Sequence, residues 1–143
     1  MTVRSILSRK GRSIVTIDPA ASLAEAARLL SEYGIGAVIV TDKGGRVAGM
    51  LSERDIVRGL SAHGPDVLGL RVDQVMTRKI VTCVENDTLG ELMERMTNGR
   101  FRHLPVVEGG RLTGIVSIGD VVKSRLEEIE AESNALREYI ATA

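Results

Sequence analysis

The sequence predicts a mixed α/β protein made of two tandem β-α-β-β-α repeats, and two observations support this prediction. The pattern Gly-x-x-Ser-x-x-Asp occurs twice, at Gly49–Asp55 and at Gly114–Asp120. Each copy follows a Gly-Gly turn between two apolar segments and precedes a segment whose apolar residues recur at helical spacing. Because similar signals surround both copies at an interval of about 65 residues, the chain contains an internal duplication.

The elements of the first repeat follow from local signals. Residues 1–13 carry apolar side chains at helical spacing, and we expect a short helix laid against the first repeat. Ser22 and Glu25 form a capping-box pattern that starts a helix, and Gly34 is positioned to end it. The other predicted elements are strands at 14–17, 37–40 and 46–51 and a helix at about 53–61.

The second repeat follows the same plan. The segment 80–83 corresponds to the strand at 14–17, Thr88-x-x-Glu91 corresponds to the capping box, and Gly99 corresponds to Gly34 within one residue. These signals divide the chain into four parts: a first repeat with its N-terminal helix (1–61), a linker rich in Gly and Pro (62–71), a second repeat (72–126) and a helical extension (127–143).

The extension carries an apolar stripe. Past Lys123 the last helix is expected to continue to Tyr139, with apolar or small residues spaced three and four apart, namely Leu126, Ile129, Ser133, Leu136 and Ile140. The stripe is too short for a long coiled coil. Packing back on the protein's own body is one explanation, and a projecting tail that contacts another subunit is the one we favour.

The repeated motif has a definite chemistry. Its Ser lies where a strand ends and a helix begins, so free backbone N–H groups and the positive end of the helix dipole point outward there. Such a position attracts an anion. The Asp three residues later, in the first helical turn, can accept hydrogen bonds from vicinal hydroxyls such as those of a ribose. The alternative explanation is that Ser-x-x-Asp only caps the helix.

The start of the central strand differs between the repeats. The first repeat has Gly34-Ile-Gly-Ala37 where the second has Arg100-Phe-Arg-His103, followed by Leu-Pro. Arg102 and His103 either decorate a strand edge or donate hydrogen bonds to a phosphate near the helix that carries Ser117. Because the first repeat lacks this pair, its affinity for phosphate is expected to be the weaker one.

Composition excludes several classes of function. The 143 residues have a formal net charge of zero and only 2% aromatic side chains, so the basic stripe and stacking surfaces of nucleic-acid binders are missing. No signal-peptide core and no long apolar run occur, so we expect a cytoplasmic protein without a membrane segment. The single Cys83 is interpreted as a small buried hydrophobe, and no metal-ligand spacing is present.

The paired motifs, together with Ile-Gly-Ala-Val-Ile-Val in one repeat and Arg-His-Leu-Pro-Val-Val in the other, resemble the cystathionine-β-synthase-type (CBS) domain family. The resemblance covers roughly residues 1–126. It implies two repeats packed about a pseudo-twofold axis into a Bateman module. It also implies two clefts for an adenosine compound such as AMP, ATP, NAD(H) or S-adenosylmethionine.

The family's binding positions are carried over residue by residue. One cleft would use Thr16, Ser52 and Asp55, and the other Thr82, Ser117 and Asp120, with Asp on the ribose and Ser on ribose or phosphate. The full set that the resemblance implies for nucleotide binding is Thr16, Ser52, Arg54, Asp55, Thr82, Arg102, His103, Pro105, Ser117 and Asp120.

Three hypotheses about function remain at this stage. The first is a stand-alone, dimeric sensor that binds an adenine nucleotide without catalysis and acts in trans on an unidentified protein. The second is a structural interaction module whose clefts are vestigial. The third is a nucleotide-processing enzyme, which has little support because no Walker, Gly-x-Gly-x-x-Gly or Ser-His-Asp arrangement stands out.

Overall fold

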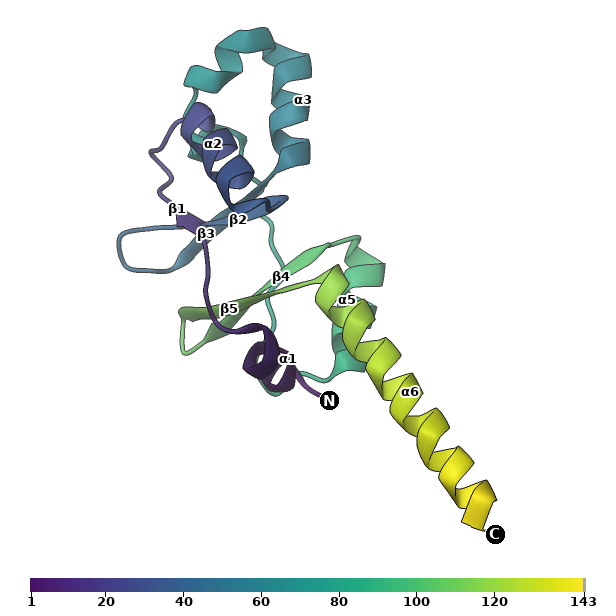
Figure 1. Cartoon of the computed structure of the whole chain (residues 1–143). Coiled ribbons are helices and arrows are strands. Elements are labelled where there is room, and N and C mark those ends of the chain that lie inside the picture. Colours follow the sequence, from purple (N-terminus) through teal and green to yellow (C-terminus); the bar gives the residue numbers. More distant parts are fainter. Residues whose placement is uncertain (143) are drawn as a thin grey trace.

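The computed structural model describes residues 1–142 and confirms a mixed α/β fold with two lobes (Figure 1). The first lobe is built around one sheet and the second around another. The elements, in chain order, are α1 (Val3–Lys10), β1 (Thr16–Ile17), α2 (Leu23–Tyr33), β2 (Ala37–Thr41), β3 (Val47–Ser52), α3 (Glu53–His63), the 3-10 helix η1 (Gly64–Gly69), α4 (Val72–Val75), α5 (Leu89–Gly99), β4 (His103–Glu108), β5 (Arg111–Ser117) and α6 (Ile118–Thr142).

The antiparallel strand pairs of the two lobes have equivalent registers. In the first lobe β1 runs parallel to β2, which pairs antiparallel with β3, and Ala37 lies opposite Ser52. In the second lobe β4 pairs antiparallel with β5, and His103 lies opposite Ser117. Ala37 and His103 therefore occupy equivalent places, each next to the Ser of a Gly-x-x-Ser-x-x-Asp motif.

The strand predicted at 80–83 is the exception. The structure has only one parallel bridge there, between Cys83 and Val106, made by hydrogen bonds from Cys83 N–H to the Pro105 carbonyl and from Val107 N–H to the Cys83 carbonyl, both 2.9 Å. The next bond of a parallel ladder would need an N–H at Pro105 to donate toward Val81, and proline has none. The sheet of the second lobe therefore stays two-stranded.

The short N-terminal helix belongs to the second lobe, so the expectation that it lies against the first repeat is wrong. Val3 and Leu7 are 0% and 1% exposed, and they pack with Leu92 and Leu104 of the second lobe. Backbone bonds hold the helix start there, because Val3 N–H donates to the Asp87 carbonyl at 3.0 Å.

The exchange is mutual. Val72, the first residue of α4, is fully buried in the core of the first lobe together with Leu23 and Leu51. Its N–H donates to the Ala21 carbonyl at 2.8 Å. Each repeat thus contributes the helix before its first strand to the core of the other, and the two lobes pack about a pseudo-twofold axis.

The segment 62–71, predicted to be a linker, is also packed. It contains the last residues of α3 and the whole of η1, with Pro65 near the η1 start. Val67 is 0% exposed and belongs to the core of the first lobe, where it lies 2.8 Å from the position a side chain at Gly59 would take. The breakers in this segment therefore form a compact corner and not a free connection.

Helices α2 and α5 begin and end as their local signals predict. The side chains of Ser22 and Thr88 accept hydrogen bonds from the Glu25 and Glu91 amides at 3.1 and 3.2 Å, so both caps are confirmed. Gly34 ends α2 in the left-handed conformation, at φ 62°. In the second lobe the left-handed residue is one position later than the Gly.

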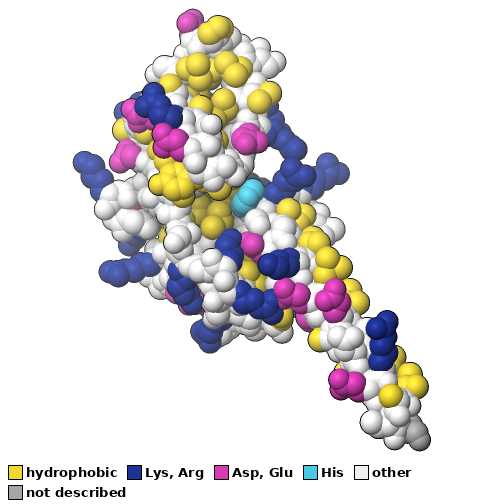
Figure 2. Space-filling view, in the orientation of Figure 1, with side chains coloured by type: hydrophobic (Ala, Val, Ile, Leu, Met, Phe, Trp, Pro, Cys, Tyr) yellow, Lys and Arg dark blue, Asp and Glu magenta, His cyan; other side chains and the backbone are white. Residues whose placement is uncertain are grey.

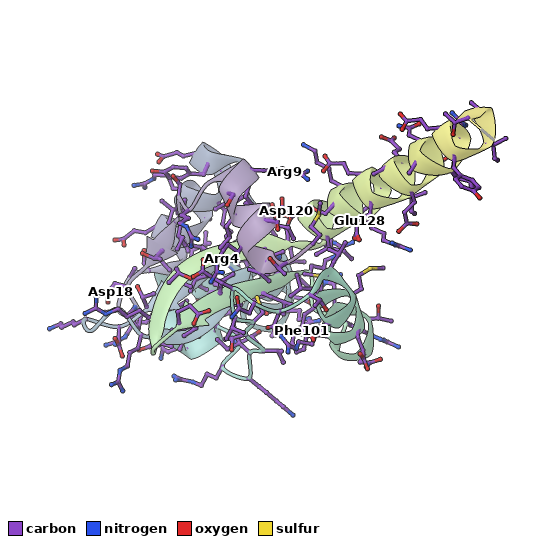
Figure 3. The ribbon with its side chains drawn as sticks, turned by 90° about the horizontal axis from the view of Figure 1, so that it is seen from below. Arg4, Arg9, Asp18, Phe101, Asp120 and Glu128 are labelled. Atoms are coloured by element: carbon purple, nitrogen blue, oxygen red, sulfur yellow. The ribbon has the colours of Figure 1, made fainter. Side chains whose placement is uncertain are left out.

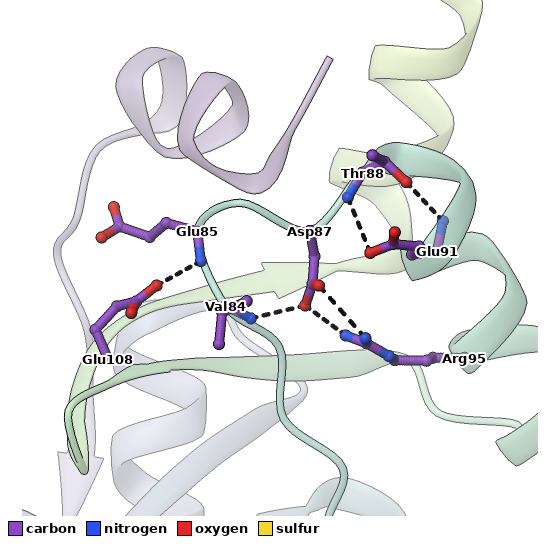
Figure 4. Close-up of polar contacts among 7 residues, drawn as sticks. All are labelled: Val84, Glu85, Asp87, Thr88, Glu91, Arg95 and Glu108. Carbon is purple, nitrogen blue, oxygen red and sulfur yellow. Dashed lines mark hydrogen bonds and ion pairs between the residues drawn. The ribbon is translucent and has the colours of Figure 1, made fainter.

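A partly buried ion pair between Asp87 and Arg95 fixes the start of α5 (Figure 4). The Asp87 carboxylate accepts hydrogen bonds from the Arg95 guanidinium at 2.5 Å and from the Val84 amide at 2.8 Å. Burial by itself would raise the pKa of Asp87, but these hydrogen bonds lower it below its ordinary value. Nearby, burial and then the charge of Asp87 raise the pKa of Cys83 to about 12, so this thiol is protonated and inert at neutral pH.

Candidate functional site

Both Gly-x-x-Ser-x-x-Asp motifs cap the helix that follows them. In the first, the Asp55 carboxylate accepts from the Ser52 amide at 3.0 Å, and the Ser52 hydroxyl accepts from the Asp55 amide at 3.2 Å. The Asp120 carboxylate and the Ser117 hydroxyl make the same two bonds, at 2.9 and 3.1 Å. Both motifs therefore cap a helix, and any ligand role of their Ser and Asp has to be compatible with these bonds.

The first motif opens into a cleft of about 570 Å³, which we call the first cleft. Ser52 and Asp55 line it from the first repeat, and Lys79–Val81 line it from the second. The cleft therefore lies where the two lobes meet. Its basic lining residues are Arg54, Arg58, Lys79, Arg100, Arg102 and His103, against the carboxylates of Glu53 and Asp55.

Thr77 is a residue of the first cleft that the sequence reasoning missed. Its hydroxyl donates to both carboxylate oxygens of Asp55, at 3.3 and 3.4 Å. Its backbone pairs with Met50 through two 2.9 Å hydrogen bonds. Gly49 makes this close approach possible, because a Cβ there would lie 2.7 Å from the Thr77 carbonyl oxygen. The motif Gly thus admits a segment of the other repeat to the Asp.

The second cleft, of about 380 Å³, is lined by Ser117 from the second repeat and by Ser13–Val15 from the first. Lys10 also lines it, and its ammonium donates to the Asp120 carboxylate at 2.6 Å and to the Ile115 carbonyl at 3.0 Å. Figure 3 shows Asp120 at the start of α6, beside α1. Burial opposes ionisation here, yet the Lys10 hydrogen bond and the Ser117 amide lower the pKa of Asp120.

The two clefts combine the repeats differently from the expectation. Thr16 and Thr82 are exposed and line neither cleft, so the predicted grouping of Thr16 with Ser52 and of Thr82 with Ser117 is wrong. The strand segment of each repeat lies instead against the motif of the other repeat. Pro105 is buried inside β4 and lines neither cleft. The helix exchange explains this crossing, because each strand segment follows a helix that packs in the opposite lobe.

The cationic pair is likewise in an unexpected place. Arg102 lines the first cleft with Ser52, although its backbone carbonyl accepts from the Ile118 amide at the start of α6, at 2.8 Å. His103 lines both clefts and marks their boundary. The Ser52 and Asp55 site therefore receives Arg102 and His103 from the other repeat, and it has more cationic lining residues than the second cleft.

The comparison with protein families agrees with this architecture. The model described as the CBS domain matches residues 3–62 and again residues 72–127. This chain belongs to the CBS domain family. Within residues 1–142, no helix combines the length and the hydrophobicity needed to cross a membrane.

Solved structures of CBS proteins resemble the chain closely. A CBS-domain containing protein from Agrobacterium tumefaciens is 51% identical, with a TM-score of 0.83, over 87% of this chain and 92% of its own. A CBS domain protein from Pyrobaculum aerophilum complexed with AMP is 25% identical, with a TM-score of 0.75, over 84% and 89% of the two chains. The CBS domain pair of protein MJ0100, in complex with 5-methylthioadenosine and S-adenosyl-L-methionine, is 25% identical, with a TM-score of 0.78, over 91% and 98%.

One backbone feature of the second CBS repeat places a cation at the first cleft. Arg100 ends α5 at φ 56°, and among the described residues no other non-glycine has a positive φ. This conformation costs an L-residue about 1–2 kcal/mol, and the first repeat avoids the cost with Gly34. Gly99 cannot be exchanged for a larger residue, because a Cβ there would lie 2.1 Å from the Phe101 ring. The strained Arg100 brings a guanidinium to the first cleft.

His103, between the two clefts of the CBS pair, has a lowered pKa. Burial is the main cause, Lys10 and Arg102 add to it, and Asp120 opposes it. Between this lowered value and the ordinary imidazole value near 6.5, the unfolded chain binds more protons than the folded one. Stability should therefore rise with pH across that window.

We expect His103→Gln to remove this part of the pH dependence, which urea unfolding of both proteins between pH 5 and pH 8 would measure. Because Gln does not titrate, the wild type should lose free energy of unfolding relative to His103→Gln as the pH falls below about 6.5, and the difference should stay constant above it. A constant difference throughout would show that His103 titrates as it does in the unfolded chain.

Proposed function

We propose that this CBS pair is a non-catalytic regulatory module that binds an adenine nucleotide of the AMP, ATP or NAD(H) type and acts in trans on another protein. One observation carries the proposal. A helix N-terminus with its Ser and Asp, a strand segment of the other repeat and a group of cations all face the same 570 Å³ cleft. The CBS proteins solved with AMP and with S-adenosyl-L-methionine support the ligand class.

The first cleft supplies each kind of contact that such a ligand requires. Asp55 is 9% exposed as a residue, and its carboxylate can accept a hydrogen bond from a ribose hydroxyl beside its bond from Thr77. Arg100 and Arg102 carry the charge that a phosphate requires. Ile80 and Val81 provide apolar surface for the adenine.

Regulation follows from the crossing of the repeats. A ligand in the first cleft touches Ser52 and Asp55 from one repeat and Arg102 from the other. The ligand therefore stabilises the relative arrangement of the lobes that it binds most tightly. The shift in population is limited by the difference between its affinities for the two arrangements. A partner protein that binds one arrangement preferentially would sense the nucleotide in this way.

The second cleft is proposed as the weaker site. Asp120 follows the Ser117 of this cleft without lining it, and Lys10 holds its carboxylate at 2.6 Å, so a ribose would have to share this carboxylate or displace the ammonium. This contact between Lys10 and Asp120 favours the structural hypothesis, in which the clefts are vestigial, for the second cleft only. We further propose a cytoplasmic protein without affinity for nucleic acid or membrane.

The proposal is tested by thermal unfolding with AMP, ADP, ATP, NAD, NADH and S-adenosylmethionine, using the wild type and the Asp55→Ala and Asp120→Ala variants. A ligand at a hundred times its dissociation constant adds about 2.7 kcal/mol, which shifts the midpoint by several degrees. We expect a shift for one nucleotide that Asp55→Ala abolishes and Asp120→Ala retains.

The control is Asp66→Ala, an exposed carboxylate of η1 that lines neither cleft. A flat response to the whole panel would favour the structural module, and release of product from any nucleotide by the pure protein would favour the enzyme. Loss of the shift in Asp120→Ala alone would move the ligand to the second cleft.

A further inference from the structure

Helix α6 extends well past the packed body of the second lobe (Figure 1). Its 25 residues span roughly 37 Å at 1.5 Å per residue. Val121 and Ser124 are buried near its start, and an ion pair between Arg9 and Glu127 fastens it to α1. From 129 to 142 the side chains are exposed, apart from a half-buried Ser133.

The projecting part carries an unpartnered apolar seam. Large side chains lie at alternating spacings of four and three residues and are 45–65% exposed: Val122, Leu126, Ile129, Leu136 and Ile140. Ser133 occupies the remaining position of this series. In a heptad written abcdefg, Leu126, Ser133 and Ile140 are at a, and Val122, Ile129 and Leu136 are at d. Figure 2 shows hydrophobic side chains along this helix, next to charged ones.

The charges that flank the seam select an occupant. In a parallel pair of helices each g residue meets the e residue five positions later on the other chain. Arg125 at g would then meet Glu130 at e, and Glu132 at g would meet Arg137 at e, so opposite charges face each other on both sides. The seam is thus complementary to a second copy of itself.

The antiparallel arrangement lacks this complementarity. With the helices fully overlapped in opposite directions, e faces e and g faces g. Glu130 would meet the other copy's Glu130, Glu132 would meet its Glu132, and Lys123 would meet Arg137. All three are like-charge pairs and oppose association.

We propose that α6 is a dimerisation helix that pairs in parallel and in register with α6 of a second copy of this chain. The apolar a and d residues provide the buried area, and Ser133 is a polar residue in the seam that disfavours other registers. Both CBS bodies then lie at the same end of the helix pair, with the C-terminal ends of the two helices side by side.

Oxidative cross-linking of Ile140→Cys tests the direction of pairing. In the parallel dimer the two residues at 140 face each other across one a layer, so we expect a disulfide-linked dimer on a non-reducing gel. The matched control is Glu138→Cys, which lies at f on the outer side and should not cross-link. The native Cys83 is 2% exposed and does not interfere. An antiparallel pair would place position 140 opposite the helix start and give no link, which would overturn the proposal.

Sedimentation of Leu136→Lys, Arg125→Glu and Arg125→Glu/Glu130→Arg tests the seam itself. Leu136 is 59% exposed in the single chain, so its substitution leaves the fold intact. We expect Leu136→Lys to be monomeric, Arg125→Glu to dimerise more weakly, and the double variant to regain the wild-type dimer. A monomeric wild type at about 100 μM, or a dimer that Leu136→Lys does not weaken, would reject the proposal.

Discussion

Replacing Leu7 with Ala should lower the free energy of unfolding by about 2–5 kcal/mol, a large fraction of the total for a domain of this size. Leu7 is 1% exposed in the core of the second lobe, although it is close to the N-terminus of the chain. Its methyl groups lie against Gly114, where a Cβ would come within 2.8 Å of them. Truncation to Ala leaves a cavity between α1 and β5 that rigid strands fill poorly.

The lobe that loses stability shows whether α1 packs in the second lobe, as in this structure, or in the lobe of its own repeat. Native-state hydrogen exchange of Leu7→Ala should show reduced protection in α5, β4 and β5 before it does in β2 and β3. The matched pair Val3→Ala and Val72→Ala, each at the first residue of its helix and each 0% exposed, should weaken opposite lobes. Weakening of the first lobe by Val3→Ala would contradict the packing of α1.

The parts of the fold that local rules govern were predictable from the sequence. Ser22-x-x-Glu25 and Thr88-x-x-Glu91 predicted the starts of α2 and α5 because a cap is decided by residues within one helical turn. The strand at 80–83, which the structure does not form, was predicted because this segment corresponds to the predicted strand at 14–17 of the first repeat. Pairing of this segment depends on the backbone N–H groups of β4, more than twenty residues later. The residues around Cys83 do not show that one of those N–H groups is missing at Pro105.

Only part of the site was predictable from the sequence, and the way the two repeats combine in each cleft was not. The motif residues Ser52, Asp55 and Ser117 line the clefts, as their helix starts suggested. Duplication suggests that each repeat completes its own site, and nothing local distinguishes that from a crossed arrangement. The contributions of Lys10 and Thr77 were missed for the same reason, because both reach an Asp that lies at least 22 positions away. The Gly of each motif was the available signal, because a Gly at the same place in both copies indicates that another segment of the chain packs closely against it.

Replacing Arg102 with Ala should weaken the binding of a phosphate-bearing adenosine ligand about tenfold and leave adenosine itself unaffected. A charged hydrogen bond is worth about 1.5–3 kcal/mol, and the exposure of Arg102 places it at the low end of that range. The substitution should not disturb the fold, because the contact between this strand and α6 uses the Arg102 backbone carbonyl. Calorimetric titration of AMP and adenosine into both proteins measures the effect.

The comparison of the two ligands separates charge from shape. Because adenosine keeps the ribose and the base, its unchanged affinity would show that the first cleft is intact in Arg102→Ala and that only the phosphate contact is gone. Arg111→Ala is the control, since Arg111 is also an exposed cation and lines neither cleft. An equal loss of affinity for AMP and adenosine would mean that Arg102 shapes the cleft. An equal loss of AMP affinity in Arg102→Ala and Arg111→Ala would mean that AMP responds to the general positive charge of the surface and not to Arg102 in particular. A loss confined to AMP and Arg102 would mean that one repeat binds the phosphate of a nucleotide whose ribose the other repeat holds, which is how a ligand couples two lobes.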